Sequence, residues 1–83
     1  MKITVRYFAS IREAIGQGSE AVDTAATTLG TLRDELIARG GAHATSLARG
    51  KAVRMALNQV LSAEDVALHE GAEVAFFPPV TGG

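Results

Sequence analysis

The sequence contains no cysteine, no tryptophan, only two prolines and no long apolar run. Without cysteine the chain can form no disulfide, thiolate metal site or cysteine nucleophile. Its apolar stretches fall far short of the roughly 20 residues that a membrane span requires. The start of the chain, Met1–Arg6, alternates apolar and polar residues and does not resemble a signal peptide. We therefore expect a cytoplasmic protein with no membrane partner.

A surplus of charge is also lacking. The formal net charge is −1, and only 20% of the residues are charged. Nucleic acids and anionic membranes are bound through dense basic surfaces, so neither is an expected partner. The two histidines, His43 and His69, are isolated in sequence without metal-ligand spacing, and we expect both at the surface. The sequence thus predicts no metal site, no bound cofactor and no catalytic constellation within this chain.

The 83 residues are enough for one small domain, and period-two patterns predict its strands. Ile3, Val5 and Tyr7 alternate with polar residues, which indicates a first strand with one buried face. Further strands are expected over 20–23, 53–57, 60–61 and 73–77, with a tight turn at Asn58-Gln59. The last strand ends in two prolines, which cannot donate to a ladder.

One main helix is expected over 28–39, with Thr28 as its N-cap. Leu29, Leu32, Leu36 and Ile37 form its apolar stripe, and Arg33 is expected off that stripe. Shorter helical segments are expected over 11–15, capped by Ser10, and over 43–48.

The first and last strands are the most hydrophobic, so both are expected at the centre of the sheet and parallel to each other. The resulting prediction is an α+β fold of the β-grasp (ubiquitin-like) type. One main helix would cover one face of a mixed sheet of about five strands. The domain would occupy residues 1–77, and residues 78–83 would form a flexible tail.

Strand alternation also predicts an apolar patch on the open face of the sheet. If Val5 and Phe76 point toward the helix, then Phe8 and Phe77 point the other way. Leu61 could join them after the turn. Contiguous exposed apolar residues next to a tail suggest a docking surface. The alternative is that a loop, or the segment 10–16, covers them.

The tail combines a stiff half with a thin end. Pro78 and Pro79 fix φ and favour an extended exit from the domain. Thr81, Gly82 and Gly83 follow, and a Gly-Gly end could thread a channel too narrow for larger residues. The α-carboxylate of Gly83 would then be accessible to an activating enzyme. The alternative is that small residues merely mark a chain end.

The chain resembles the small, sulfur-carrying subunits of molybdopterin synthase, a ubiquitin-like family. The resemblance covers nearly the whole sequence and is carried by four stretches. They are Val5-Arg6-Tyr7-Phe8-Ala9-Ser10-Ile11-Arg12-Glu13, Thr28-Leu29-Gly30-Thr31-Leu32, Ala56-Leu57-Asn58-Gln59, and the closing Gly71-Ala72-Glu73-Val74-Ala75-Phe76-Phe77-Pro78-Pro79-Val80-Thr81-Gly82-Gly83. The closing stretch is the most specific, whereas Gly-Gly alone would be a weak signal.

The resemblance implies a mechanism in which this chain is a non-catalytic carrier. An E1-like adenylyltransferase would use ATP to adenylate Gly83, and a sulfur donor would replace AMP to give a thiocarboxylate. The tail would then enter the molybdopterin synthase large subunit, within a heterotetramer, and supply sulfur to cyclic pyranopterin monophosphate. The resemblance places positions matching Phe8, Arg12, Leu61 and Phe77 at the large-subunit interface. The expected contact surface also takes in the tail root. Its residues are Pro78, Pro79 and Val80.

Three other functions stay open at the level of sequence. A sulfur carrier for thiamin thiazole synthesis or tRNA thiolation would use the same activated tail. A ubiquitin-like modifier would join its C-terminus to protein lysines. A plain interaction module would leave the tail inert.

Overall fold

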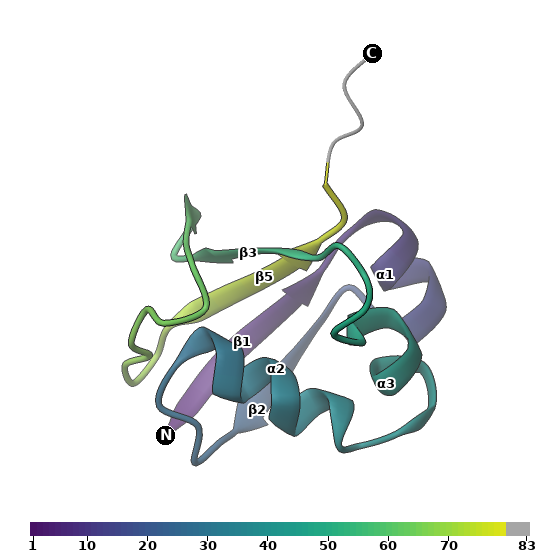
Figure 1. Ribbon diagram of the computed structural model, residues 1–83. Coiled ribbons are helices and arrows are strands. Elements are labelled where there is room, and N and C mark those ends of the chain that lie inside the picture. The colour runs from purple at the N-terminus through teal and green to yellow at the C-terminus, as the bar shows by residue number, and fades with distance from the viewer. Residues whose placement is uncertain (80–83) are drawn as a thin grey trace.

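The computed structural model describes residues 1–79, which form a five-stranded sheet with three helices on one face (Figure 1). The strands lie in the order β2-β1-β5-β3-β4. They are β1 (Lys2–Tyr7), β2 (Ser19–Asp23), β3 (Arg54–Leu57), β4 (Val60–Leu61) and β5 (Glu73–Phe77). The helices are α1 (Ala9–Ile15), α2 (Leu29–Ile37) and α3 (Gly41–Leu47). This architecture confirms the predicted α+β, β-grasp fold.

The first and last strands lie side by side at the centre of the sheet. β1 pairs with β5 in parallel, with Val5 opposite Val74 and Tyr7 opposite Phe76. β1 also pairs antiparallel with β2, and β5 pairs antiparallel with β3. The predicted parallel central pair is therefore confirmed. Because β1 and β5 end at the same edge of the sheet, the chain leaves β5 close to the point where Phe8 follows β1.

The hydrophobic core lies between the sheet and the helices. Ile3, Val5 and Tyr7 are buried there, while the residues between them along β1 are exposed. Val74 and Phe76 of β5 are fully buried in the same core. The predicted register of both strands is confirmed, since a slip of one residue would have reversed these faces.

Helix α2 begins where the sequence predicts. The Thr31 N–H donates to the Thr28 hydroxyl (3.2 Å), and the Thr28 N–H donates to the Thr31 hydroxyl (3.0 Å). This capping box satisfies two backbone donors, both of which would have no partner inside the helix. Leu32 is fully buried, as its place on the apolar stripe requires. The helix ends at Ile37, earlier than the predicted 28–39.

One expectation about the helices is wrong. Helix α1 begins directly after β1, with Phe8 rather than Ser10 as its N-cap. The Phe8 carbonyl accepts hydrogen bonds from the N–H groups of Ile11 (3.2 Å) and Arg12 (3.3 Å), which leaves Ser10 inside the first turn. The two shorter helical segments, expected over 11–15 and 43–48, form α1 and α3 and also contribute to the core. Ile11 of α1 and Leu47 of α3 are buried in the same core as α2.

Arg33 is buried, although helical periodicity places it off the apolar stripe. Only 4% of the residue is exposed. Its guanidinium donates to the carbonyls of Leu47 (2.7 Å), Ala48 (2.8 Å) and Lys51 (3.2 Å). These carbonyls lie at and beyond the end of α3, where the helix itself provides no donors. Arg33 therefore joins α2 to the segment that follows α3.

His43 is not a free surface residue, contrary to expectation. Its side chain is 17% exposed, and its Nε2 lies 3.0 Å from the Glu20 carboxylate. The same carboxylate accepts hydrogen bonds from Tyr7 Oη (2.8 Å), the Arg39 guanidinium (2.6 Å) and the Gln17 amide (3.2 Å). The His43 ring also packs edge-on against Tyr7, with centroids 5.8 Å apart. This network joins β1, β2, α3 and the end of α2 through one carboxylate.

Acid is expected to remove the stability that the Glu20 network contributes. Burial raises the pKa of this carboxyl, but hydrogen bonds from Arg39, His43 and Tyr7 outweigh burial and lower the pKa from 4.5 to about 2. The contribution is therefore complete above about pH 4.5 and is lost as the pH falls toward about 2. Urea unfolding at several pH values should show that Glu20→Gln has a lower free energy of unfolding than wild type. This difference should narrow as the pH falls through this window. Glu13→Gln, an exposed control on α1, should have the same free energy of unfolding as wild type at each pH. A loss of stability in Glu20→Gln that does not change with pH would contradict the role given to the Glu20 carboxylate.

Candidate docking surface at the root of the C-terminal tail

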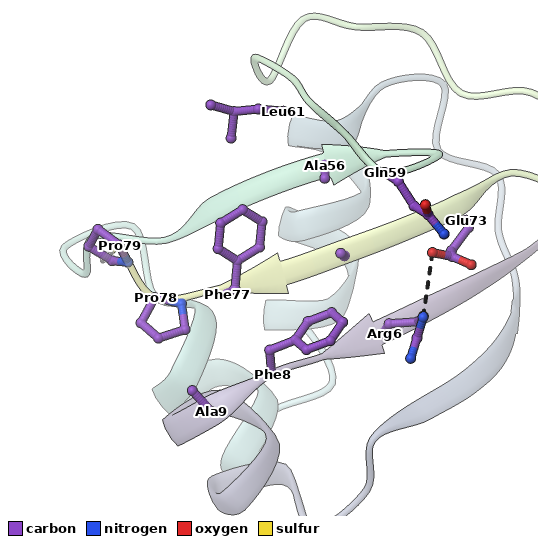
Figure 2. Close-up of a pocket in the computed structure, with 11 residues that line it drawn as sticks. Arg6, Phe8, Ala9, Ala56, Gln59, Leu61, Glu73, Phe77, Pro78 and Pro79 are labelled. Atoms are coloured by element: carbon purple, nitrogen blue, oxygen red, sulfur yellow. Dashed lines mark ion pairs between the residues drawn. The ribbon is translucent and has the colours of Figure 1, made fainter. Parts of the chain in front are cut away.

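An apolar cleft lies on the open face of the sheet, opposite the helices (Figure 2). We call it the sheet cleft. Its walls come from β1, β3, β4 and β5, from the turn between β3 and β4, and from the start of α1. The lining residues are Arg6, Phe8, Ala9, Ala56, Gln59, Leu61, Glu73, Ala75, Phe77, Pro78 and Pro79.

The three apolar residues expected on the open face all line this cleft. Phe8 follows β1 and is 38% exposed, and Leu61 on β4 is 63% exposed. Phe77 closes β5 and is half-buried, on the face opposite to the fully buried Phe76. Helix α1 contributes Ala9 to the rim but does not cover the cleft. The alternative, in which the segment 10–16 covers the patch, is therefore wrong.

Leu61 reaches the cleft because of the tight turn before it. Asn58 and Gln59 adopt positive φ angles of 49° and 69°, as a two-residue hairpin turn requires. The turn folds β4 back on β3, so that Leu61 lies opposite Ala56. A residue beyond a loop is thereby added to an apolar surface that starts on β1 and β5.

The tail leaves the domain from one end of this cleft. Pro78 and Pro79 follow β5, are half-buried and line the cleft beside Phe77 and Phe8 (Figure 2). The remaining predicted tail residues lie outside the described part of the chain. They are Val80, Thr81, Gly82 and Gly83.

Arg12 does not belong to the sheet cleft. It is exposed on α1, and its side chain lies beside Gly18 in a separate groove with Glu13 and Gln17. The structure thus brings Phe8 and Leu61 together with Pro78 and Pro79, but it leaves Arg12 apart from them. A role for Arg12 at the same interface stays a prediction.

Sequence patterns did not reveal that one end of the cleft is charged. Arg6 Nη1 lies 3.8 Å from a carboxylate oxygen of Glu73, and the Arg6 guanidinium lies 5.2 Å from the centroid of the Phe8 ring. Alternation predicts that Arg6 and Glu73 both face the open side. Only the register of the parallel strands, which sets Arg6 opposite Ala75, brings the two charges within reach.

Other kinds of site are not found among residues 1–79. No group of three or more His, Asp or Glu side chains there could hold a metal ion. No helix in this part of the chain has both the length and the apolar character needed to cross a membrane.

Comparison with known proteins agrees with the fold and with the sequence resemblance. The model of the ThiS family matches residues 5–83. The chain belongs to the ThiS family. The molybdopterin synthase sulfur carrier subunit of Escherichia coli K12 is 42% identical over 81 residues, which cover 98% of this chain and 99% of that protein. The family resemblance predicted from sequence is therefore confirmed.

The solved structures similar to this ThiS-family chain include a modifier protein and a subunit of a two-subunit complex. SAMP1 of Haloferax volcanii, a small archaeal modifier protein, covers 100% of both chains with 27% identity and a TM-score of 0.77. A chain from the complex of subunits 1 and 2 of the molybdopterin-converting factor of Helicobacter pylori also covers 100% of both chains, with 27% identity and a TM-score of 0.67. Proteins of this fold thus include both a modifier and a member of a two-subunit complex.

Proposed function

We propose that this chain is the sulfur carrier of molybdopterin synthase. In this proposal a cytoplasmic, E1-like adenylyltransferase uses ATP to convert the Gly83 carboxylate to an acyl-adenylate. A carboxylate is a poor electrophile, and AMP supplies the missing leaving group. A sulfur donor then displaces AMP and leaves a C-terminal thiocarboxylate. The large subunit takes up the tail and transfers the sulfur to cyclic pyranopterin monophosphate. Two carriers and two large subunits would form the heterotetramer.

The observation that carries this proposal is the sheet cleft at the root of the tail. Phe8, Leu61 and Phe77 offer a contiguous apolar surface that the domain leaves open to solvent. Such a surface favours a protein partner. Pro78 and Pro79 line the same cleft, so a partner bound there would lie directly beside the exit of the tail. The full-length likeness to a sulfur carrier subunit supports the choice of partner.

The proposal assigns the catalytic groups to the two partners. Within residues 1–79 no group of three or more His, Asp or Glu side chains could hold a metal ion, and the Glu20 carboxylate is engaged by Tyr7 and Arg39 rather than by residues of the cleft. In this proposal the chain presents the reactive terminus, and the adenylyltransferase and the large subunit supply the catalytic groups.

Truncating Phe77 is expected to weaken binding of the large subunit. An aromatic anchor at the centre of an interface contributes roughly 1–3 kcal/mol, which corresponds to about five-fold to 150-fold in Kd. Isothermal titration calorimetry of Phe77→Ala against the large subunit measures this change. Val60→Ala is a matched control, because Val60 is 65% exposed next to Leu61 but does not line the cleft. An unchanged Kd for Phe77→Ala would rule out the cleft as the docking site.

Reconstitution tests the function itself. The chain, the adenylyltransferase, ATP, a sulfur source and the large subunit should together convert cyclic pyranopterin monophosphate to molybdopterin. Omission of this chain should stop the conversion. Conversion at an undiminished rate without the chain would contradict the proposal.

A modifier function is the second candidate, favoured by the likeness to SAMP1. It would use the same acyl-adenylate, with a lysine amine of another protein in place of the sulfur donor. Immunoblotting of cell extracts would then show conjugates of higher mass that depend on Gly83. A carrier for thiamin or tRNA thiolation would instead co-purify with a thiazole synthase or a tRNA-modifying enzyme and not with the large subunit.

A further inference from the structure

The sheet cleft has two chemically different ends. Phe8, Phe77 and the two prolines form an apolar end, where the tail leaves β5 (Figure 2). Arg6, Gln59 and Glu73 form a polar end, at the start of β5. Phe77 lies four positions after Glu73 along the extended strand β5, a distance of about 13 Å at roughly 3.3 Å per step.

Arg6 carries the positive charge of the polar end, but its own domain does not provide hydrogen-bond acceptors for its guanidinium. Its side chain is 44% exposed, and its only charged partner, Glu73, is 3.8 Å away. That separation is too long for a hydrogen bond, which requires about 2.7–3.2 Å between nitrogen and oxygen. Within residues 1–79 the Arg6 guanidinium makes no other ion pair, and it lies over the Phe8 ring. No hydrogen bond joins the guanidinium to residues 1–79, so its N–H donors stay available to a partner.

A partner that covers the cleft must also cover this guanidinium. Removing water from charged donors without replacing their acceptors is costly, whereas a hydrogen bond to a charged group strengthens binding by roughly tenfold to a hundredfold. The planar fork of arginine matches a carboxylate, which can accept two parallel hydrogen bonds. Glu73 lies on one side of the Arg6 guanidinium, and the rest of the group stays available.

We propose that Arg6 is a specificity-determining residue of the sheet cleft and that the large subunit places an acidic side chain against it. This inference rests on the proposed function, because it concerns the same partner in the same cleft. The apolar end would supply most of the buried area, and Arg6 would select a partner that carries a carboxylate at the polar end. Because the two ends differ, the contact also prevents the partner from binding in the reverse direction.

The backbone conformation of Gln59 supports a binding role for the polar end. It adopts φ 69°, a left-handed conformation that favours glycine, asparagine or aspartate in such turns. The turn thus holds a glutamine side chain on the cleft where a glycine would be conformationally easier. Backbone positions of this kind concentrate at binding sites.

Three charge variants test the proposal in titrations of the full chain against the large subunit. Arg6→Gln removes the charge, Arg6→Glu reverses it, and Lys2→Glu makes the same reversal on the open face of β1 but outside the cleft. We expect Kd to rise about tenfold to a hundredfold for Arg6→Gln. Arg6→Glu should raise Kd at least about tenfold more than Arg6→Gln, because it places a second carboxylate next to the proposed carboxylate of the partner. Lys2→Glu should leave Kd within about twofold of the wild-type value. Added salt should reduce the difference in Kd between Arg6→Gln and Arg6→Glu, because it screens the repulsion between charges.

Each outcome decides for or against the inference. Equal Kd values for Arg6→Gln and Arg6→Glu would overturn it, because a neutral acceptor on the partner would not distinguish them. Unchanged binding of both variants would overturn it as well. If Phe77→Ala weakens binding while the Arg6 variants do not, the inference fails and the proposed function stands. If Phe77→Ala also has no effect, docking in the cleft fails. Unchanged thermal unfolding midpoints establish that the Arg6 variants are folded.

Discussion

One glycine added after Gly83 is expected to abolish sulfur transfer while the domain stays folded. The extension moves the terminal carbonyl by about 3.3 Å along the tail, whereas a misplacement of about 1 Å at a reacting centre can already cost a hundredfold in rate. We therefore expect at least about a hundredfold loss in molybdopterin formation with the reconstituted enzymes. Full activity of the extended protein would show that the terminal acyl group is not the site of chemistry.

The extended protein also separates chemistry from docking. The added residue follows the tail and leaves Phe8, Leu61 and Phe77 untouched in the sheet cleft. Its Kd for the large subunit and its thermal unfolding midpoint should therefore match those of wild type. An added alanine makes a matched comparison, because it displaces the carbonyl equally and adds a methyl group. Similar losses for glycine and alanine would identify displacement as the cause.

Replacing Phe76 by alanine is expected to be the most destabilising of the proposed changes. Phe76 is fully buried, and its ring stacks on Tyr7 with centroids 6.3 Å apart. Truncation of a buried phenylalanine typically costs about 3–5 kcal/mol, because it removes apolar contacts and leaves a cavity. Small domains have only about 5–15 kcal/mol of stability, so the loss is a large part of the total. Urea unfolding followed by circular dichroism measures it.

Phe77→Ala is the matched control for this experiment. The neighbouring aromatic ring lies on the opposite face of the same strand, in the open cleft, so its truncation should cost less than about 1 kcal/mol of stability. Its effect should appear instead in binding of the large subunit. Equal losses of stability for the two variants would contradict the division of β5 into a core face and a docking face.

Features that depend on local periodicity could be predicted from the sequence. The period-two pattern of β1 and β5 fixes which side of each strand is buried, and hence which way Phe8 and Phe77 point. Thr28 was identified as a cap because its side chain bonds within one helical turn. The apolar part of the site was therefore within reach of sequence reasoning.

Features that depend on contacts between distant segments could not be predicted in this way. The buried Arg33 is satisfied by carbonyls at least 14 residues further along the chain, and His43 meets Glu20 across 23 residues. The prediction that Ser10 caps α1 is wrong because β1 leads directly into α1, so that the Phe8 carbonyl accepts the first hydrogen bonds of the helix. The polar end of the cleft depends on the parallel register of β1 and β5, which the composition of neither strand reveals.

Intact-mass analysis of the chain after reaction with its adenylyltransferase, ATP and a sulfur source tests the central claim most directly. The account predicts a product in which one oxygen is exchanged for sulfur, located by fragmentation at Gly83. Consumption of ATP with no sulfur at the terminus, or with sulfur at another residue, would contradict it.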